Sequence, residues 1–230
     1  MEKHKEKIII FDASTLISFS LNGLFDEFKD LKKIFRGKFI ITEDVRREVI
    51  DKPLKIKRFE LEALRIKKLV EDGILEYPST LGIKDKDVSY KTSELLEIAN
   101  QTFDVSGKKM HVVDLGEMSA LALSKMLTEK GINNVIAVDE RTTRMLIEKP
   151  DNLERLFEKK LHTKVRANRN NFKFFKGPKL IRSTELIYVA YKKGLVGLKN
   201  GLVLDALLYA MKYKGCSISE DEIEEMKKLK

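Results

Sequence analysis

The sequence predicts an α/β fold in which a mostly parallel sheet of four or five strands carries helices on both faces, with further helices at the C-terminal end. Short runs rich in β-branched residues alternate with longer segments whose apolar residues recur at helical spacing. Two of the runs, KIIIFD (7–12) and VIAVD (135–139), are apolar up to a final aspartate. Such runs are typical of strands buried on both faces of a parallel sheet.

The first part of the chain is predicted to alternate strands and helices. Ser14 is placed to cap the first helix, and Pro53 ends a later one, because proline cannot continue a helix. The expected strands are 7–12, 38–42 and 74–77. The expected helices are 14–35 with a break near Asn22 and Gly23, 43–50, and a segment from Ile56 that ends at Gly73.

The second part begins with a polar segment, about 79–110, that predicts only a weak helix near 93–101. A strand over 135–139 and a further strand within 172–181 are expected. The expected helices are 114–130, 140–149, 183–194, 201–213, and a last one opened by the capping box of Ser219 and Glu222. We expect one large domain over 1–198 and a C-terminal helical extension over 199–230.

Composition restricts the class of protein. The chain has 230 residues and a net charge of +9, and its single cysteine excludes an internal disulfide and a cysteine-rich zinc site. No apolar run is long enough to span a membrane, and the N-terminus lacks the shape of a signal peptide. We therefore expect a cytoplasmic protein that does not act at a membrane.

The positive charge is concentrated in one connecting segment, 159–182, which contains nine Lys or Arg residues and no Asp or Glu. Three phenylalanines, 172, 174 and 175, interleave with these charges, and this combination suits a phosphate backbone with stacked bases. The alternative is a solvated basic loop whose phenylalanines belong to the core. The predicted nucleic-acid contacts are Lys164, Arg166, Arg169, Lys173 and Lys176.

Two aspartates, Asp12 and Asp139, each end a predicted parallel strand. Ligands bind outside the carboxyl ends of such strands, so both side chains should reach one crevice. Two carboxylates about 4 Å apart repel by roughly 4 kcal/mol at an effective dielectric near 20. A shared proton or a hard divalent cation relieves this repulsion. The alternative role for each aspartate is to cap the helix that follows.

Further acidic residues lie on two predicted helices. Glu48 lies beside the buried stripe of its helix, so it either reaches the crevice or pairs with Arg47 or Lys52. Asp114 and Glu117 open another helix, where they would form a capping box or supply a metal ligand, and the spacing leaves both roles open. A site built from carboxylates alone suits Mg²⁺ or Mn²⁺ and not zinc. Beside a basic surface, such a metal favours phosphodiester hydrolysis.

These residues together resemble the PIN-domain ribonucleases. The matching stretches are IIIFDASTLI (8–17), TEDVRREVI (42–50), DLGEMSALALS (114–124) and VIAVDERTTRML (135–146). The resemblance implies a three-layer, PIN-like fold with a basic connection at about 159–182, and Mg²⁺- or Mn²⁺-dependent cleavage of RNA.

Position by position, Asp12, Glu48 and Asp139 match the acidic set of that family, and Ser14 matches its hydroxyl position. The fourth acid is Asp114 or Glu117. We therefore predict Asp12, Glu48, Glu117 and Asp139 as catalytic residues, and these four with Asp114 as metal ligands.

The family includes toxins paired with antitoxins, RNA-processing factors and inactive scaffolds. The resemblance therefore implies RNA as a partner, an antitoxin-like or RNA-processing protein as a candidate partner, and a homodimer as a candidate assembly. A non-catalytic RNA-binding or scaffold protein is the alternative function. An aspartate-nucleophile phosphatase is disfavoured, because Ser14 stands where that chemistry needs a second acid.

Overall fold

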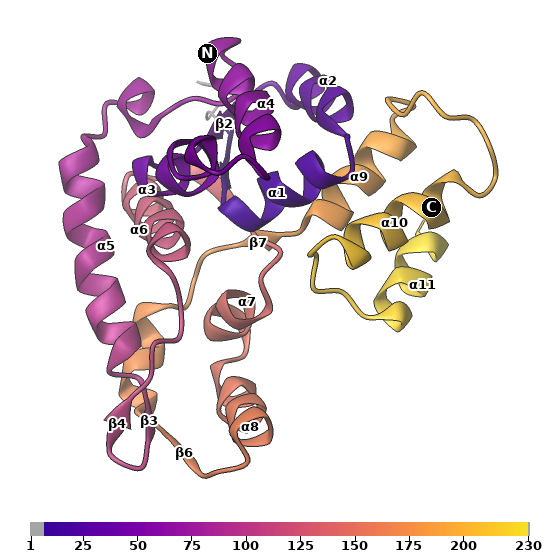
Figure 1. Ribbon diagram of the computed structural model, residues 1–230. Coiled ribbons are helices and arrows are strands. Elements are labelled where there is room, and N and C mark those ends of the chain that lie inside the picture. The colour runs from indigo at the N-terminus through magenta and orange to yellow at the C-terminus, as the bar shows by residue number, and fades with distance from the viewer. Residues whose placement is uncertain (1–6, 230) are drawn as a thin grey trace.

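The computed structural model describes residues 7–229, in which a four-stranded parallel sheet is covered by helices on both faces (Figure 1). The strand order is β2-β1-β5-β7. The strands are β1 (Lys7–Phe11), β2 (Lys38–Ile40), β5 (Asn133–Ala137) and β7 (Leu180–Ile181). In the register, Ile10 lies opposite Ile40 of β2 and Ile136 of β5. The predicted α/β class and the parallel sheet are confirmed.

Helices occupy most of the chain between the strands. They are α1 (Ala13–Leu21), α2 (Phe25–Phe35), α3 (Glu43–Arg46), α4 (Glu60–Glu71), α5 (Asp85–Asn100), α6 (Leu115–Glu129), α7 (Arg141–Glu148), α8 (Pro150–Leu161), α9 (Ser183–Lys192), α10 (Val203–Tyr213) and α11 (Glu220–Lys228). The predicted break between the first two helices is present, and Ser219 caps α11 as its capping box predicts. Within residues 7–229, no helix is both long and apolar enough to cross a membrane.

Alternate residues of β1 enter two different hydrophobic cores. Ile9 and Phe11 belong to the first core, with α1, α2 and the C-terminal helices, whereas Ile8 and Ile10 belong to the second, with α5 and α6. This alternation follows from the two-residue period of a strand, since successive side chains point to opposite faces. It explains why the run KIIIF is apolar at every position after its first residue.

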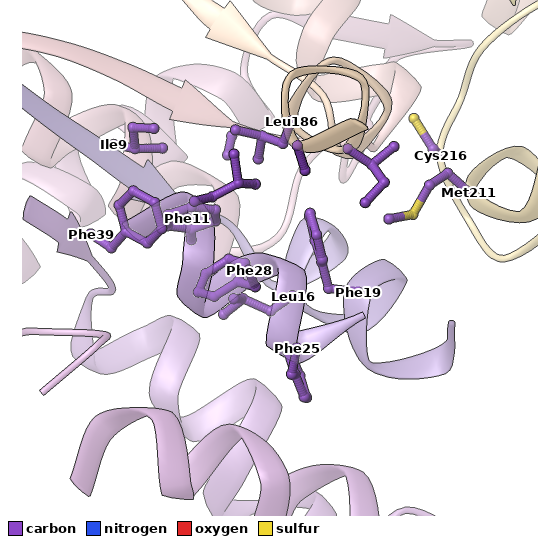
Figure 2. Packing of buried hydrophobic residues seen from close by; sticks show 14 of the residues in the cluster. Ile9, Phe11, Leu16, Phe19, Phe25, Phe28, Phe39, Leu186, Met211 and Cys216 are labelled. Atoms are coloured by element: carbon purple, nitrogen blue, oxygen red, sulfur yellow. The ribbon is translucent and has the colours of Figure 1, made fainter. Parts of the chain in front are cut away.

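Aromatic rings fill the centre of the first core (Figure 2). The ring of Phe28 lies 5.0 Å from that of Phe11 and 5.2 Å from those of Phe19 and Phe39, measured between centroids. Met211 of α10 and residues of α11 join the same core, so the C-terminal helices pack directly against the N-terminal half of the chain. The predicted boundary at 198/199 therefore does not separate two hydrophobic cores.

A small antiparallel sheet, of order β4-β3-β6, lies at the far end of α5 from α1, α2 and α4 (Figure 1). It consists of β3 (Phe103–Val105), β4 (Lys108–Lys109) and β6 (Val165–Ala167). Ser106 and Gly107 connect β3 to β4 with φ of 52° and 82°. Positive φ at both central residues is what a two-residue hairpin turn with the twist of its strands requires.

One local prediction was wrong, and two others had the wrong extent. The segment expected as strand 74–77 forms a single bridge, between Glu76 and Ile40. The weak helix near 93–101 is in fact the 16-residue α5, whose buried stripe includes Thr92 and Ala99 and is therefore not strongly apolar. The strand expected within 172–181 is present only as β7, because a 3₁₀ helix (Arg169–Phe174) occupies the start of that range and Gly177 and Pro178 lie between the two elements.

Candidate acidic site

The carboxyl ends of β1 and β5 form the base of the site. The chain leaves β1 for β2 on one side and later returns to β5 on the other, so the sheet reverses its order between β1 and β5. Asp12 follows β1, and its N–H donates to the carbonyl of Ala137, 2.9 Å away, at the end of β5. Asp139 lies two residues further along. The two aspartates thus meet at a topological switch point, where ligands of α/β sheets bind.

Ser14 connects the two aspartates. Its hydroxyl donates to Oδ2 of Asp12 at 2.6 Å and accepts the N–H of Asp139 at 3.0 Å. Its own N–H also donates to Oδ2 of Asp12, at 3.0 Å, which makes Asp12 the N-cap of α1. The capping role considered for Asp12 is therefore present, but it occupies only one carboxylate oxygen.

The second oxygen of Asp12, Oδ1, is buried and has no hydrogen-bond partner among residues 7–229. Leaving a buried polar atom unpaired costs about 1–3 kcal/mol, and more for a charged group. Burial raises the pKa of Asp12 despite the bonds from Ser14, and the charge of Asp139 adds to the shift. This oxygen is free to accept a proton or to bind a hard cation.

Asp139 is fully buried, and both of its oxygens are occupied. Oδ2 accepts the hydroxyl of Ser18 at 2.6 Å, and Oδ1 accepts the N–H of Ser183 at 2.7 Å. These bonds join α1 and α9 to the end of β5. Asp139 therefore brings its negative charge close to Asp12 while its carboxylate holds two helices in place.

Glu48 enters the site from a π-helical segment (Arg47–Asp51) that directly follows α3. π-Helical turns are rare and occur frequently at functional sites. Burial, followed by the charges of Asp12 and Asp114, raises the pKa of Glu48 to about 7. The pairing with Arg47 that the sequence left open does not form, because Arg47 pairs with Asp44 at 3.2 Å.

Gly116, in the first turn of α6, makes room for the carboxylate of Glu48. A Cβ atom added at Gly116 would lie 2.5 Å from Oε2 of Glu48, closer than real Cβ contacts allow. The conformation of Gly116 is ordinary, so its need for glycine comes from this close approach and not from backbone strain. The close approach of Glu48 therefore gives a steric explanation for the glycine in the DLGE stretch.

The structure distinguishes the two acids of the DLGE turn (114–117), between which the sequence could not decide. Both take part in a capping box, and the N–H of Asp114 donates to Oε2 of Glu117 at 2.7 Å. The side chain of Asp114 is 74% exposed and contacts Nε2 of His111 at 3.0 Å. Glu117 is directed inward, where burial and the charge of Asp12 raise its pKa to about 8. Asp114 lies at the rim of the site, whereas Glu117 lies inside it.

Asp12, Glu48 and Glu117 therefore form one electrostatically coupled cluster. Within residues 7–229, no three acidic, His or Cys side chains already surround a point with the geometry of a metal site. In the structure, Glu117 accepts the N–H of Asp114, and Asp139 accepts the hydroxyl of Ser18 and the N–H of Ser183. The carboxylate oxygens of this cluster are of the kind that can hold protons or a hard cation.

The basic segment has a different structure from the one its aromatic residues suggested. Phe172 and Phe175 are buried in the second core, so the alternative reading of a basic loop with core phenylalanines is right for them. Phe174 is half-buried, with Nζ of Lys173 5.2 Å from its ring centroid. These rings therefore form no open stacking platform.

The predicted basic contacts are all exposed, but they are not equivalent. The exposed residues are Lys164, Arg166, Arg169, Lys173 and Lys176. Arg169 pairs with Asp151 at 3.2 Å and also with Glu154, so much of its charge is already balanced. No acidic partner lies within salt-bridge distance of the other four in the described chain.

Sequence reasoning missed three residues that shape the site: Ser18, Gly116 and Ser183. Ser18 lies one helical turn after Ser14 and so faces the same side of α1, which is a signal that spacing could have supplied. Ser183 acts through its backbone N–H, which no side-chain pattern reveals.

Comparison of the chain with protein-family models, with curated proteins and with solved structures finds no match. The PIN-domain resemblance therefore depends on the four sequence stretches and remains a prediction.

Proposed function

We propose that this protein is a metal-dependent ribonuclease with a PIN-like fold, which hydrolyses RNA phosphodiester bonds at the acidic cluster. The main support is the buried, unpartnered Oδ1 of Asp12, with Glu48 and Glu117 each close enough for burial and the charge of Asp12 to raise its pKa. All of the available donor atoms are carboxylate oxygens, which suit Mg²⁺ or Mn²⁺.

In this proposal Asp12, Glu48 and Glu117 would hold the metal, with Asp114 at the rim. A bound Mg²⁺ or Mn²⁺ ion would supply a Lewis acid that activates water and offsets charge on the leaving oxygen. Ser14 donates twice to Oδ2 of Asp12, which leaves Oδ1 without a hydrogen-bond partner in the described chain. Asp139 acts as a positioning residue. Its N–H donates to the hydroxyl of Ser14, and its carboxylate accepts hydrogen bonds from α1 and α9.

The basic segment would hold the RNA backbone. Lys164, Arg166, Lys173 and Lys176 are exposed and lack an acidic partner within the described chain, so each is free to contact a phosphate. We expect Arg169 to contribute less to RNA binding, because its guanidinium would have to leave two acids.

Asp12→Asn tests the proposal. This substitution removes the charge but keeps the side-chain oxygen that caps α1, so we expect loss of Mn²⁺-dependent cleavage of single-stranded RNA with the fold retained. Asp205→Asn is the matched control, because Asp205 is an exposed acid that pairs with Lys227 on the C-terminal helices. Cleavage at an undiminished rate by Asp12→Asn protein would refute the assignment.

A non-catalytic RNA-binding scaffold is the second candidate, and two observations favour it. The oxygens of Asp139 are fully occupied and Glu117 is engaged in a cap, so the cluster also has a structural role without a metal. If the wild-type protein binds RNA but cleaves none with Mg²⁺ or Mn²⁺ up to pH 9, the scaffold function is the better description. An antitoxin-like or RNA-processing partner, a homodimer and a cytoplasmic location stay predictions from the sequence.

A further inference from the structure

A pocket of about 420 Å³ lies between α7, the start of α8 and the segment that leads into α11 (Figure 1). Most of its lining residues are polar or charged. Three of them are cations, Arg141, Arg144 and Lys149, which belong to α7 or directly follow it. The lining thus offers cationic donors, which the acidic cluster lacks.

Two of the three cations have no acid to pair with. Within residues 7–229, the only salt bridge from these residues joins Nη2 of Arg144 to Oε2 of Glu148, at 3.8 Å. Arg141 and Lys149 are exposed. A guanidinium or ammonium group in this state is free to bind an anion, and the planar guanidinium matches the oxygens of a phosphate in particular.

The other acid in the lining, Glu222, is already engaged. Its Oε1 accepts from Nη1 of Arg182 at 2.8 Å, and its Oε2 accepts the N–H of Ser219 at 2.8 Å. Arg182 also pairs with Glu185, so these three charged side chains together carry one negative charge. With Glu148 they balance two of the three cations, so the surroundings of the pocket keep an excess of positive charge.

Arg144 connects the pocket to the acidic site. Its Nη1 donates to the carbonyl of Ser217 at 2.9 Å, and the N–H of Ser217 donates to the carbonyl of Asp139 at 3.1 Å. Arg141 opens α7 two residues after Asp139. The pocket therefore lies beside the end of β5 that carries Asp139, and an anion bound in it would be a neighbour of the acidic cluster.

α8 connects the same pocket to the basic segment (159–182). Lys149 precedes this helix and Asn152 lies in its first turn, whereas the basic segment begins in its last turn. A helix of 12 residues is about 18 Å long. A single acidic side chain could not reach both ends, whereas a nucleic-acid strand carries a phosphate at every nucleotide and can contact both.

We propose that this pocket binds a phosphate group of the RNA strand that the acidic cluster cleaves. The two guanidinium groups and Lys149 provide charge-assisted hydrogen bonds, and the hydroxyl of Ser217 and the side-chain amide of Asn152 add uncharged donors. Phosphate oxygens accept hydrogen bonds from these types of side chain in nucleic-acid complexes. The choice of RNA as the ligand rests on the proposed function.

The test compares the wild-type protein with an Arg141→Gln/Lys149→Gln double variant, which removes two exposed charges and no salt bridge of the described chain. The probe is a short single-stranded RNA with a fluorophore at its 3′ end, prepared with a 5′-phosphate and with a 5′-hydroxyl. Binding is measured by fluorescence anisotropy in EDTA, so that no cleavage is needed. Lys84→Gln/Lys86→Gln is the matched control, because it removes two exposed charges at the start of α5.

We expect the double variant to bind RNA about tenfold more weakly than the wild type and the control, since a hydrogen bond to a charged group is worth roughly that factor or more. The slope of log affinity against log salt should fall by about 0.7, the value for one phosphate of a single strand. If the 5′-phosphate strengthens binding to the wild type only, the pocket holds the terminal phosphate. An equal loss with both probes assigns it to an internal phosphate.

A second variant changes the charge of the lining without removing a cation. Asn152→Asp adds a negative charge with little change in shape, so it should also weaken RNA binding. Asn200→Asp is its control, because Asn200 is exposed in the loop between α9 and α10 and aspartate can keep its hydrogen bond from the N–H of Leu202.

RNA affinity and salt slope that are unchanged in the double variant, or reduced no more than in its control, would overturn the inference. Loss of polyglutamate binding in the double variant, with RNA binding unchanged, would assign the pocket to an acidic protein partner instead. The outcome is separable from the proposed function. RNA binding that depends on Arg141 and Lys149 without any cleavage refutes only the nuclease, and cleavage by a double variant with undiminished RNA affinity refutes only the phosphate pocket.

Discussion

Replacing Glu117 by Gln is expected to stabilise the metal-free protein at alkaline pH and to leave its stability unchanged at acidic pH. Glu117 is half-buried close to the charge of Asp12, and its pKa is raised from 4.5 to about 8. Glutamine keeps an oxygen that accepts the N–H of Asp114, so the cap of α6 is retained. The substitution therefore removes the charge with little change in shape.

The sign follows from proton linkage. A carboxyl whose folded pKa is raised binds its proton more tightly in the folded state, so folding carries no penalty below the unfolded pKa and the full penalty above the folded one. The free energy of unfolding of the wild-type protein should fall as pH rises from 4.5 to about 8. A shift of this size corresponds to at most about 5 kcal/mol, at about 1.4 kcal/mol per pKa unit.

The neighbouring acids relax and share protons, so we expect about 2–3 kcal/mol to be recovered by Glu117→Gln above pH 8. For a chain of this length, that corresponds to a rise of about 5–10 °C in Tm. The assay is thermal unfolding in EDTA, followed by circular dichroism at pH 5, 7 and 8.5. Glu129→Gln, an exposed substitution at the other end of α6, is the control.

Two results would refute this reasoning. One is a wild-type Tm that does not fall between pH 5 and 8.5. The other is a Glu117→Gln protein that is less stable than the wild type at every pH, which would mean that the carboxylate of Glu117 stabilises the fold through its capping contact and is not under electrostatic strain.

Three other predictions concern the site and the basic segment. Gly116→Ala should displace the carboxylate of Glu48, so Mn²⁺ affinity measured by calorimetry should fall at least tenfold. The free energy of unfolding should stay the same or rise by up to about 1 kcal/mol, because alanine is the better helix former. Unchanged Mn²⁺ affinity would count against Glu48 as a ligand. Ser18→Ala leaves Oδ2 of Asp139 without its hydrogen bond, so the free energy of unfolding from urea titration should fall by about 1–3 kcal/mol. An unchanged free energy of unfolding would contradict that hydrogen bond. Lys173→Gln should lower the slope of log affinity for RNA against log salt by about one, whereas Arg169→Gln should change it less; equal effects in fluorescence anisotropy would contradict the different pairing of the two residues.

The sequence predicted the α/β class because the signal is strong where strands are buried on both faces. The run at 8–11 has no polar residue, and each of its side chains enters one of the two cores. The sequence predicted only the second half of α5, because Thr92 and Ala99 belong to a buried stripe that is not strongly apolar along the chain. It also failed for the small sheet, whose short strands are defined by pairing between β3 and β6, far apart in sequence.

The sequence likewise predicted part of the candidate site but not all of it. The sequence placed Asp12 and Asp139 at strand ends, and the structure brings those ends together because β1 and β5 are neighbours. The helical spacing of Ser18 from Ser14 was a signal that could have predicted the Ser18 contact with Asp139. The contact from the N–H of Ser183 could not be predicted, because a backbone donor leaves no side-chain pattern. Nor could the sequence separate Asp114 from Glu117, because both serve the same capping box and differ only in the direction they face.

The location of a divalent cation tests the central claim most directly. Crystals soaked in Mn²⁺ near pH 8 would reveal the ion by its anomalous scattering. The account predicts a peak within coordination distance of Oδ1 of Asp12, with Glu48 and Glu117 among the ligands. A saturating soak that leaves this cluster without a peak, or places the ion only elsewhere on the protein, would contradict it.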